Sequence, residues 1–128
     1  MSKLRDLIYL KASVPILSGN LYNSSKKTDG YYINASGKVT EGPSASISDY
    51  MAVEPGDYVW TGVSGESGSN NKRAVGYNSS KTYTSVLNSV AVTGAGVPYT
   101  NEFTVPNGTA YVRISFNTTD THIVVKSK

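Results

Sequence analysis

The sequence predicts an all-β protein, an antiparallel β-sandwich or jelly roll, and three observations support this prediction. Ser, Thr, Asn and Gly fill 52 of the 128 positions, beside ten Tyr and one Trp, so residues typical of turns and strands far outnumber helix formers. From Asn20 onward, apolar and polar residues alternate along short segments, which is the period of a strand with one buried face. Gly, Pro and Asn separate these segments at short, even intervals.

Length, charge and composition exclude several classes of protein. A chain of 128 residues forms one domain, and the absence of Cys excludes a disulfide framework and Cys-based zinc sites. A single His excludes a multi-histidine metal site within one chain. The net charge of +3 comes from scattered basic pairs, so we expect no nucleic-acid binding. No apolar run is long enough to span a membrane, and charged residues interrupt the N-terminal segment, so we expect neither membrane insertion nor a signal peptide.

Residues 1–19 differ from the rest of the chain, and we treat them as a segment outside the sandwich of residues 20–128. Their apolar spacing fits a short helix, and part of the segment fits a strand equally well. Two alternatives stay open: an N-terminal strand of the domain, or an anchor that buries its apolar side chains on another chain. The anchor would form a homo-oligomer such as a trimer. The apolar side chains concerned are Leu4, Leu7, Ile8, Leu10, Ile16 and Leu17.

The strands expected in the first part of the sandwich are short and bounded by turn residues: 31–34, 38–40, 49–53, 58–63 and 72–77. Residues 35–37 form a hairpin turn between the first two. Glu54-Pro55-Gly56-Asp57 forms another, because Pro fixes φ and Gly supplies a positive φ. The small polar residues 64–71 are expected to form a loop.

The second part of the sandwich contains the clearest strand. We expect 82–87 to be a strand or a short excursion, 89–99 a weakly patterned connection, and 102–105 and 121–125 strands. In 110–116 the alternation is strict, so one set of side chains faces the core and the other faces outward or a second layer. The core set is Ala110, Val112, Ile114 and Phe116, and the other set is Tyr111, Arg113 and Ser115.

The titratable residues do not form a catalytic pattern. The acidic residues lie mostly at turns and strand ends, and no pair is placed as a glycoside hydrolase requires. His122 has no nucleophile motif near it and is expected to be an ordinary surface histidine. We therefore predict no catalytic residue, no cofactor and no metal ion, and no enzyme activity.

The aromatic residues indicate a binding function instead. Flat aromatic rings stack on the C–H faces of sugars, and the planar donors of Arg match pairs of hydroxyl groups. Five tyrosines lie beside predicted loops and are expected at the surface: Tyr31, Tyr32, Tyr77, Tyr83 and Tyr99. Trp60 is either a core residue or a ligand platform. Arg73 and Arg113 each either bind a sugar or pair with an acid. The candidate glycan-binding residues are Tyr31, Trp60, Arg73, Tyr77, Tyr83 and Tyr99.

Four blocks of sequence together resemble the carbohydrate-binding-module-like jelly-roll domains of bacteriophage structural proteins, over about residues 20–126. The blocks are Asn20–Asn23 with Thr28–Asn34 and Gly37, Ser48–Tyr58, Lys72–Asn78 with Lys81–Tyr83, and Phe103–Pro106 with Ala110–Ser115. Such domains occur on baseplate, tail-fibre and head-fibre proteins. Where the family often has an Asp after an aromatic residue, this chain has Asn78 after Tyr77.

The resemblance implies a virion protein, in a fibre, a baseplate or a capsid decoration, that displays a glycan-binding sandwich on the outside of the phage particle. Its partners would be host-surface or environmental polysaccharide and, through the N-terminal segment, other virion proteins. Two alternatives stay open: a purely structural decoration subunit without ligand binding, and a non-catalytic domain of a secreted glycanase.

Overall fold

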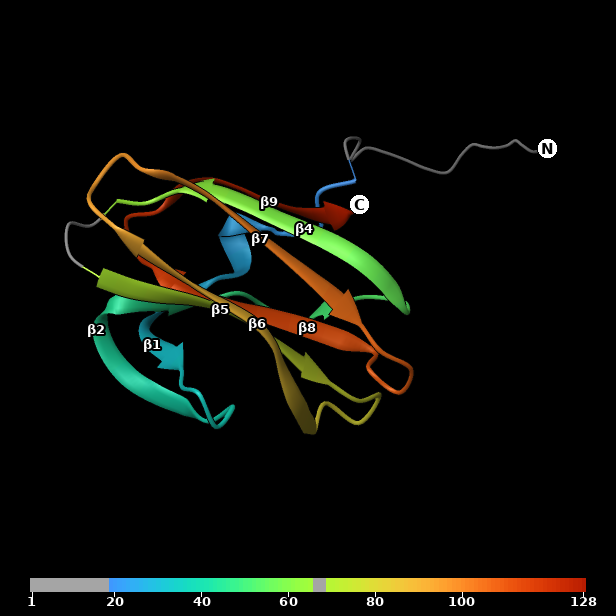
Figure 1. Ribbon diagram of the computed structural model, residues 1–128. Helices are drawn as coiled ribbons and strands as arrows, with labels where there is room; N and C mark the ends of the chain where they lie inside the picture. The colour runs from blue at the N-terminus through green and yellow to red at the C-terminus, as the bar shows by residue number, and fades with distance from the viewer. Residues whose placement is uncertain (1–18, 66–68) are drawn as a thin grey trace.

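A computed structural model of the chain describes residues 19–65 and 69–128, and within them the protein is a sandwich of two antiparallel sheets (Figure 1). This confirms the predicted all-β sandwich. The anchor side chains proposed from the sequence, Leu4, Leu7, Ile8, Leu10, Ile16 and Leu17, lie outside the described residues.

The larger sheet has the strand order β1-β2-β8-β5-β6, and the short β3 pairs with β8 beside that path. The smaller sheet has the order β7-β4-β9 and forms the upper layer in Figure 1. A single 3-10 turn, Ser24–Lys26, precedes the first strand. The strands of the larger sheet are β1 Thr28–Ile33, β2 Val39–Ile47, β3 Met51–Ala52, β5 Ser69–Tyr77, β6 Tyr83–Thr93 and β8 Tyr111–Asn117. Those of the smaller sheet are β4 Gly56–Val63, β7 Pro98–Val105 and β9 Thr121–Ser127.

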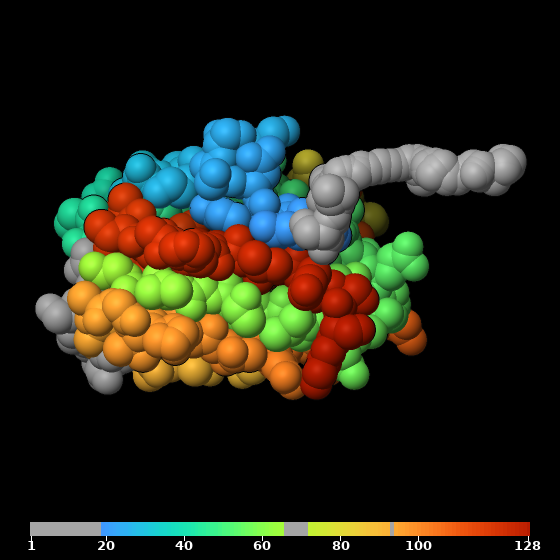
Figure 2. All heavy atoms as spheres, turned by 90° about the horizontal axis from the view of Figure 1, so that it is seen from above, coloured from blue at the N-terminus to red at the C-terminus, as the bar shows by residue number. Residues whose placement is uncertain are grey.

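The start of the described chain runs along the free edge of β9. The Leu21 N–H donates to the Val125 carbonyl at 2.7 Å. The Asn20 side chain accepts from the Val125 N–H at 2.9 Å and donates to the Ile123 carbonyl at 3.2 Å. Figure 2, which views this face from above, shows the first described residues (blue) beside β9 (red). Asn20 and Leu21 therefore contribute directly to the smaller sheet.

Several strands are longer than the sequence pattern predicts, among them β7, which begins at Pro98 inside the expected connection 89–99. β5 begins at Ser69, inside the expected loop 64–71, and β6 continues to Thr93, inside the expected connection 89–99. The cause is hairpin pairing: β5 and β6 are hydrogen-bonded from Ser69 opposite Thr93 down to Tyr77 opposite Tyr83. Main-chain pairing along an edge strand does not require apolar alternation, so side chains give little sign of these extensions.

β2 also exceeds the predicted 38–40, since it runs to Ile47 and includes Pro43. Its ladder with β1 shifts register between Asp29 and Tyr31, and Pro43 has no Cα partner in either ladder of β2. A bulge of this kind accommodates a residue without an N–H donor.

The main core lies between the sheets, and β8 supplies its centre. Val112 and Ile114 are fully buried and Phe116 is 2% exposed, as the alternation predicts, while Ala110 precedes the strand and is half-buried. On the other face of β8, Tyr111 and Arg113 are half-buried. Ser115 is buried there because a second layer covers it, and its hydroxyl accepts the Ile33 N–H at 3.0 Å.

Truncating Ile114 to Ala is expected to lower the free energy of unfolding by about 2–5 kcal/mol, the usual cost of a large-to-small change at a packed site. Ile114→Val, the matched smaller deletion, is expected to cost only about 0.5–1.5 kcal/mol. Urea denaturation of the two variants measures both values. A loss below 1 kcal/mol for the Ala variant, about the cost of one methylene group, would contradict this packing.

Candidate functional site

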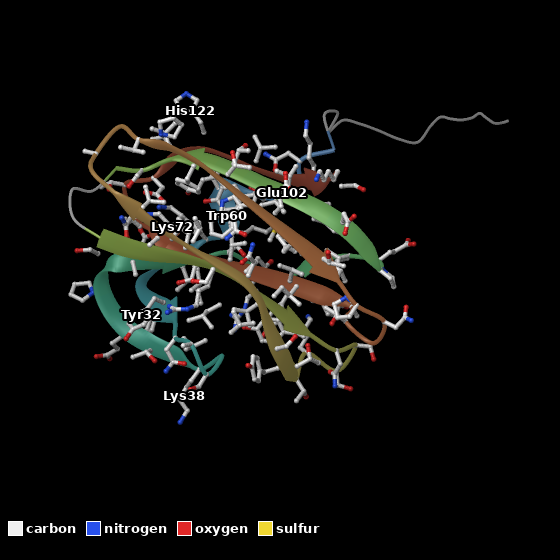
Figure 3. All side chains as sticks on the ribbon, in the orientation of Figure 1. Tyr32, Lys38, Trp60, Lys72, Glu102 and His122 are labelled. Atoms are coloured by element: carbon white, nitrogen blue, oxygen red, sulfur yellow. The ribbon has the colours of Figure 1, made fainter. Side chains whose placement is uncertain are left out.

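Two of the six predicted site residues lie in the core. Trp60 is fully buried and Tyr99 is 6% exposed, and their rings meet edge to face with centroids 5.7 Å apart. Figure 3 shows Trp60 between the layers. The structure therefore selects the core alternative for Trp60, and the surface position predicted for Tyr99 is wrong. The reason is that Tyr99 belongs to β7, whose burial alternates strictly from Pro98 to Val105.

The other four predicted residues, Tyr31, Arg73, Tyr77 and Tyr83, lie on the face of the larger sheet that points away from the smaller sheet. Tyr77 pairs with Tyr83 across β5 and β6, so the two side chains share a face. The neighbours of Arg73 in β5, Lys72 and Ala74, point toward the smaller sheet, so Arg73 points to the outer face. Tyr31 lies two residues before Ile33 in β1 and therefore points to the same outer face as Ile33. Tyr31 and Tyr83 are 38% and 40% exposed, as expected, whereas Tyr77 is 3% exposed, so its predicted surface position is wrong.

Tyr77 is buried because this outer face carries a small second core. Ile33, Ile47, Val75 and Tyr77 pack there as a separate buried cluster. The larger sheet curls so that its two edge hairpins meet: the Arg73 guanidinium donates to the Ile33 carbonyl at 3.2 Å, and the Tyr83 ring lies directly against Gly37. The outer face is therefore a curved, partly covered surface.

The two hairpin turns that meet across this surface are built alike. Asn34 accepts the N–H groups of Ser36 and Lys38 at 2.9 and 3.0 Å. Asn78 accepts those of Ser80 and Thr82 at 2.9 and 3.0 Å. The fourth residue of each turn has a left-handed backbone, with φ 80° at Gly37 and φ 62° at Lys81. Since left-handed φ is rare for a residue with a side chain, the turn holds Lys81 in an unusual conformation.

Gly37→Ala is expected to lower the free energy of unfolding by about 1–3 kcal/mol, because the new Cβ would be left-handed and would overlap the Tyr83 ring. Lys81→Gly, at the matching position of the other turn, is the control: it relieves the left-handed side chain and is expected to cause no such loss. Thermal and urea denaturation of both variants measure the difference. Equal destabilisation by the two changes would show that the hairpin contact contributes nothing.

Three tyrosines and two cations gather at one end of this face, and we call them the aromatic–cationic cluster: Tyr50, Tyr77, Lys81, Tyr111 and Arg113. The Tyr50 ring meets those of Tyr77 and Tyr111 edge to face, with centroids 5.0 and 6.0 Å apart. The Arg113 guanidinium lies 4.3 Å from the centroid of the Tyr50 ring, and the Lys81 ammonium lies 5.1 Å from it. Both distances are within the range of cation–π attraction.

The cluster carries positive charge that no carboxylate among residues 19–65 and 69–128 balances through an ion pair. Arg113 donates from Nε and from a terminal nitrogen to the Tyr77 hydroxyl, at 3.3 and 3.2 Å. Neither Arg113 nor Lys81 forms an ion pair with a carboxylate of the described residues. Burial raises the pKa of the Tyr77 hydroxyl, and the bonds from Arg113 oppose that rise only in part. The Tyr77 hydroxyl therefore stays protonated at neutral pH, and the face presents hydrogen-bond donors and cations.

Tyr50, Lys81 and Tyr111 are absent from the set predicted for the site, and Arg113 was considered as a sugar ligand from the sequence without being included in that set. Tyr111 and Arg113 alternate with the core residues of β8, so their common face follows from the sequence. Tyr50 and Lys81 lie in separate connections, and only the pairing of β8 with β3 and β5 brings them beside that strand. Tyr50 also lines a groove with Asn23, Lys26 and Asp49, which extends the surface next to the cluster.

Among residues 19–65 and 69–128, no group of three or more His, Cys, Asp or Glu is placed to hold a metal ion. His122 is exposed, and its ring nitrogen contacts only the Thr121 hydroxyl in the hydrogen bonds of the described chain. No helix in that same part of the chain has the length and apolar character to cross a membrane. No protein-family model, curated protein or solved structure matches the chain.

Proposed function

We propose that the protein is a non-catalytic glycan-binding sandwich on the outside of a phage particle, in a fibre, a baseplate or a capsid decoration, and that it attaches the particle to host-surface or environmental polysaccharide. The observation that supports glycan binding is the aromatic–cationic cluster, in which Arg113 and Lys81 lie against tyrosine rings and form no ion pair with a described carboxylate. The virion location rests on the resemblance of residues 20–126 to phage structural domains.

The chemistry of the cluster favours an acidic sugar. Tyr50 and Tyr111 are half-buried, so each keeps part of its ring open for stacking on the apolar face of a pyranose. Lys81 is exposed, and Arg113 stands between two rings with donors that suit a carboxylate or phosphate. A uronic acid or a sugar phosphate would supply the negative charge that no ion-pairing carboxylate of the described residues places there.

A single site of this size binds weakly, and many copies on one particle compensate for that. Linked sites act at a high effective concentration, so modest affinities multiply into strong attachment. In this proposal residues 1–19 join the chain to identical copies and to other virion proteins. A purely structural decoration subunit is the alternative, and it would bind no polysaccharide.

Lys81→Gly is expected to weaken binding to an acidic polysaccharide such as polygalacturonate by about 2–5-fold, the worth of one exposed cation–π site. The variant keeps the turn, because Gly occupies the matching position 37 in the other hairpin. Lys38→Thr is the matched control: it removes one positive charge from that other turn and copies Thr82, the residue at the matching position. Figure 3 shows Lys38 at the tip of the β1–β2 hairpin. Binding to immobilised polysaccharide, with neutral dextran in parallel, measures the effect.

Three outcomes would count against the proposal. Equal losses from Lys81→Gly and Lys38→Thr would show that only net charge matters. Equal binding of dextran and polygalacturonate would remove the preference for acidic sugars. No binding of any polysaccharide by the full-length chain on a glycan array would favour the structural subunit.

A further inference from the structure

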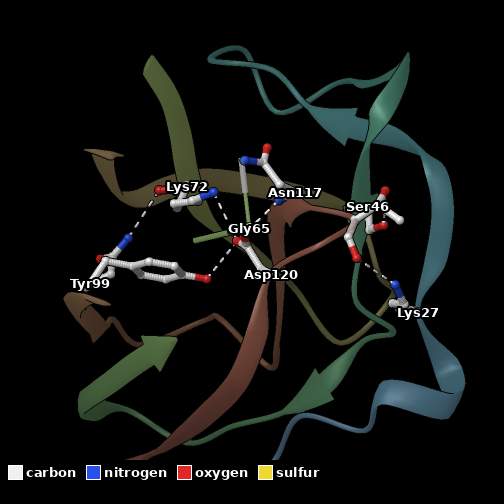
Figure 4. A network of polar contacts seen from close by, with 9 residues as sticks. Lys27, Ser46, Gly65, Lys72, Tyr99, Asn117 and Asp120 are labelled. Carbon is white, nitrogen blue, oxygen red and sulfur yellow. Dashed lines mark hydrogen bonds and ion pairs between the residues drawn. The ribbon is translucent and has the colours of Figure 1, made fainter. Parts of the chain in front are cut away.

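Lys72 and Asp120 face each other inside the sandwich, and both side chains are fully shielded from water. The Lys72 ammonium nitrogen lies 3.0 Å from Oδ2 of Asp120, with both side chains 0% exposed. Lys72 points inward from β5, and Asp120 lies in the turn between β8 and β9 (Figures 3 and 4). Burying two charges costs a large desolvation energy, which offsets much of the attraction between Lys72 and Asp120.

Three donors converge on the Asp120 carboxylate. The Gly65 N–H donates to Oδ1 at 2.9 Å, while the Tyr99 hydroxyl and the Asn117 N–H donate to Oδ2 at 2.9 and 3.3 Å. Burial and the neighbouring Asp120 raise the pKa of Tyr99 well above its usual value, so this hydroxyl keeps its proton. Figure 4 shows these groups around one carboxylate. Donors placed in this way stabilise negative charge that develops on the oxygens during attack at the carboxyl carbon.

The Lys72 nitrogen lies close to the Asp120 carboxylate, but its geometry is not that of a hydrogen bond. Although Nζ lies at ion-pair distance from Oδ2, it has no geometrically complete hydrogen bond. The ammonium is therefore not fixed along an oxygen lone pair, which is where a settled salt bridge would place it. The Asn101 side chain donates to the Lys72 carbonyl at 3.2 Å and fixes the main chain from which the amine projects.

We propose that Lys72 and Asp120 join in an intramolecular isopeptide bond. A proton first passes from the Lys72 ammonium to Oδ2 of Asp120, which lies 3.0 Å away, and this leaves a free lone pair on the amine. The amine lone pair then attacks Cγ of Asp120, and the C=O electron pair moves to Oδ1, where the Gly65 N–H stabilises it.

The intermediate collapses with loss of water. The electron pair on Oδ1 re-forms the C=O bond, the Cγ–Oδ2 bond breaks, and Oδ2 leaves as water after taking the proton that the attacking nitrogen gives up. The Tyr99 hydroxyl, bonded to Oδ2, is placed to relay that proton. The balance is one ammonium and one carboxylate giving one amide and one water, with no oxidant, reductant or cofactor. The fold holds the amine and the carboxyl group next to each other, whereas the same two groups free in water rarely meet in a reactive orientation.

The test is the intact mass of the full-length chain under denaturing conditions, measured when fresh and after prolonged incubation in the folded state. The expected mass is lower than the sequence mass by one water, and proteolysis is expected to release one branched fragment that joins the peptides of residues 72 and 120. Lys72→Met and Asp120→Ala are expected to give the full sequence mass. Tyr99→Phe is expected to form the bond about 100-fold more slowly, the loss typical of a removed proton donor.

One side reaction gives the same mass change, and peptide mapping distinguishes it from the isopeptide bond. Asp29 precedes Gly30, and an Asp-Gly pair that closes to a cyclic imide also loses one water. Hydroxylamine opens a cyclic imide and leaves an amide intact. A folded wild-type chain that keeps its full mass after incubation, or a water loss that maps to residues 29 and 30 alone, overturns the proposal and leaves Lys72 and Asp120 as a salt bridge.

Discussion

Replacing Asp120 with Ala is expected to lower the free energy of unfolding by about 3–5 kcal/mol, among the largest effects of any single change in this protein. The loss arises because the Lys72 ammonium would stay fully buried without a partner. The N–H groups of Gly65 and Asn117 and the Tyr99 hydroxyl would lose their acceptor as well. If the two side chains form an amide in the wild type, the expected loss is larger, because the variant lacks the cross-link as well as the partner of the lysine.

A double variant, Lys72→Met with Asp120→Asn, is the control for this effect. Met fills the space of the lysine stem without a charge, and the Asn carbonyl still accepts the Gly65 N–H. Replacing both members of a buried pair costs far less than removing one. In urea denaturation the double variant is therefore expected to be clearly more stable than Asp120→Ala, because the cost of the unpaired charge is gone, whereas the stability of an amide cross-link would not return. A double variant as unstable as Asp120→Ala would show that packing, and not the unpaired charge, sets the cost.

The alternation of apolar and polar residues predicted those strands in which one face is buried and the other is more exposed to solvent. β7 and β8 illustrate the two outcomes. In β8 the inward set of Val112, Ile114 and Phe116 was found from the sequence, since polar residues separate them. In β7 the burial alternates just as strictly, but the inward residue Asn101 is polar and hides the pattern.

Lys72 shows why the buried polar pair could not be predicted. In sequence, Lys72-Arg73 is one of several scattered basic pairs that are typical of a solvated surface. β5 lies between β6 and β8 with both faces covered, so Lys72 and Ala74 enter the main core while Arg73 and Val75 enter the second layer. A strand that is buried on both sides has no polar face to mark its register. Asp120 lies in the turn between β8 and β9, and only the folded position of that turn brings its carboxylate beside Lys72.

The aromatic composition of the candidate site was predictable from the sequence, but its position only in part. The abundance of Tyr predicts a binding face, which stays a prediction, and Tyr31, Tyr77 and Tyr83 share one sheet face. The cluster itself combines residues of β5, β8 and two connections. Its positive charge stays uncompensated because Arg113 and Lys81 form no ion pair with the described carboxylates. That property belongs to the tertiary arrangement, because Arg113 and Lys81 are 32 positions apart in the chain.

Trp60→Ala is expected to lower the free energy of unfolding by about 3–5 kcal/mol, because it removes the largest side chain that is fully buried between the sheets. The indole contacts Tyr99 edge to face, and Tyr99 in turn donates to Asp120, so the cavity would also loosen the buried polar group. Urea denaturation measures this loss, and Trp60→Phe, which keeps an aromatic ring, is expected to cost much less.

The two variants also separate a core role from a ligand platform. Trp60 lies between the layers, whereas the aromatic–cationic cluster lies on the outer face of the larger sheet, so Trp60→Phe is expected to leave binding to immobilised polygalacturonate unchanged. A Trp60→Phe protein that unfolds at the wild-type urea concentration but no longer binds would place the indole against the sugar. A loss of stability without loss of binding is the result that full burial of Trp60 requires, since a ring with no exposed face has no surface on which a sugar could stack.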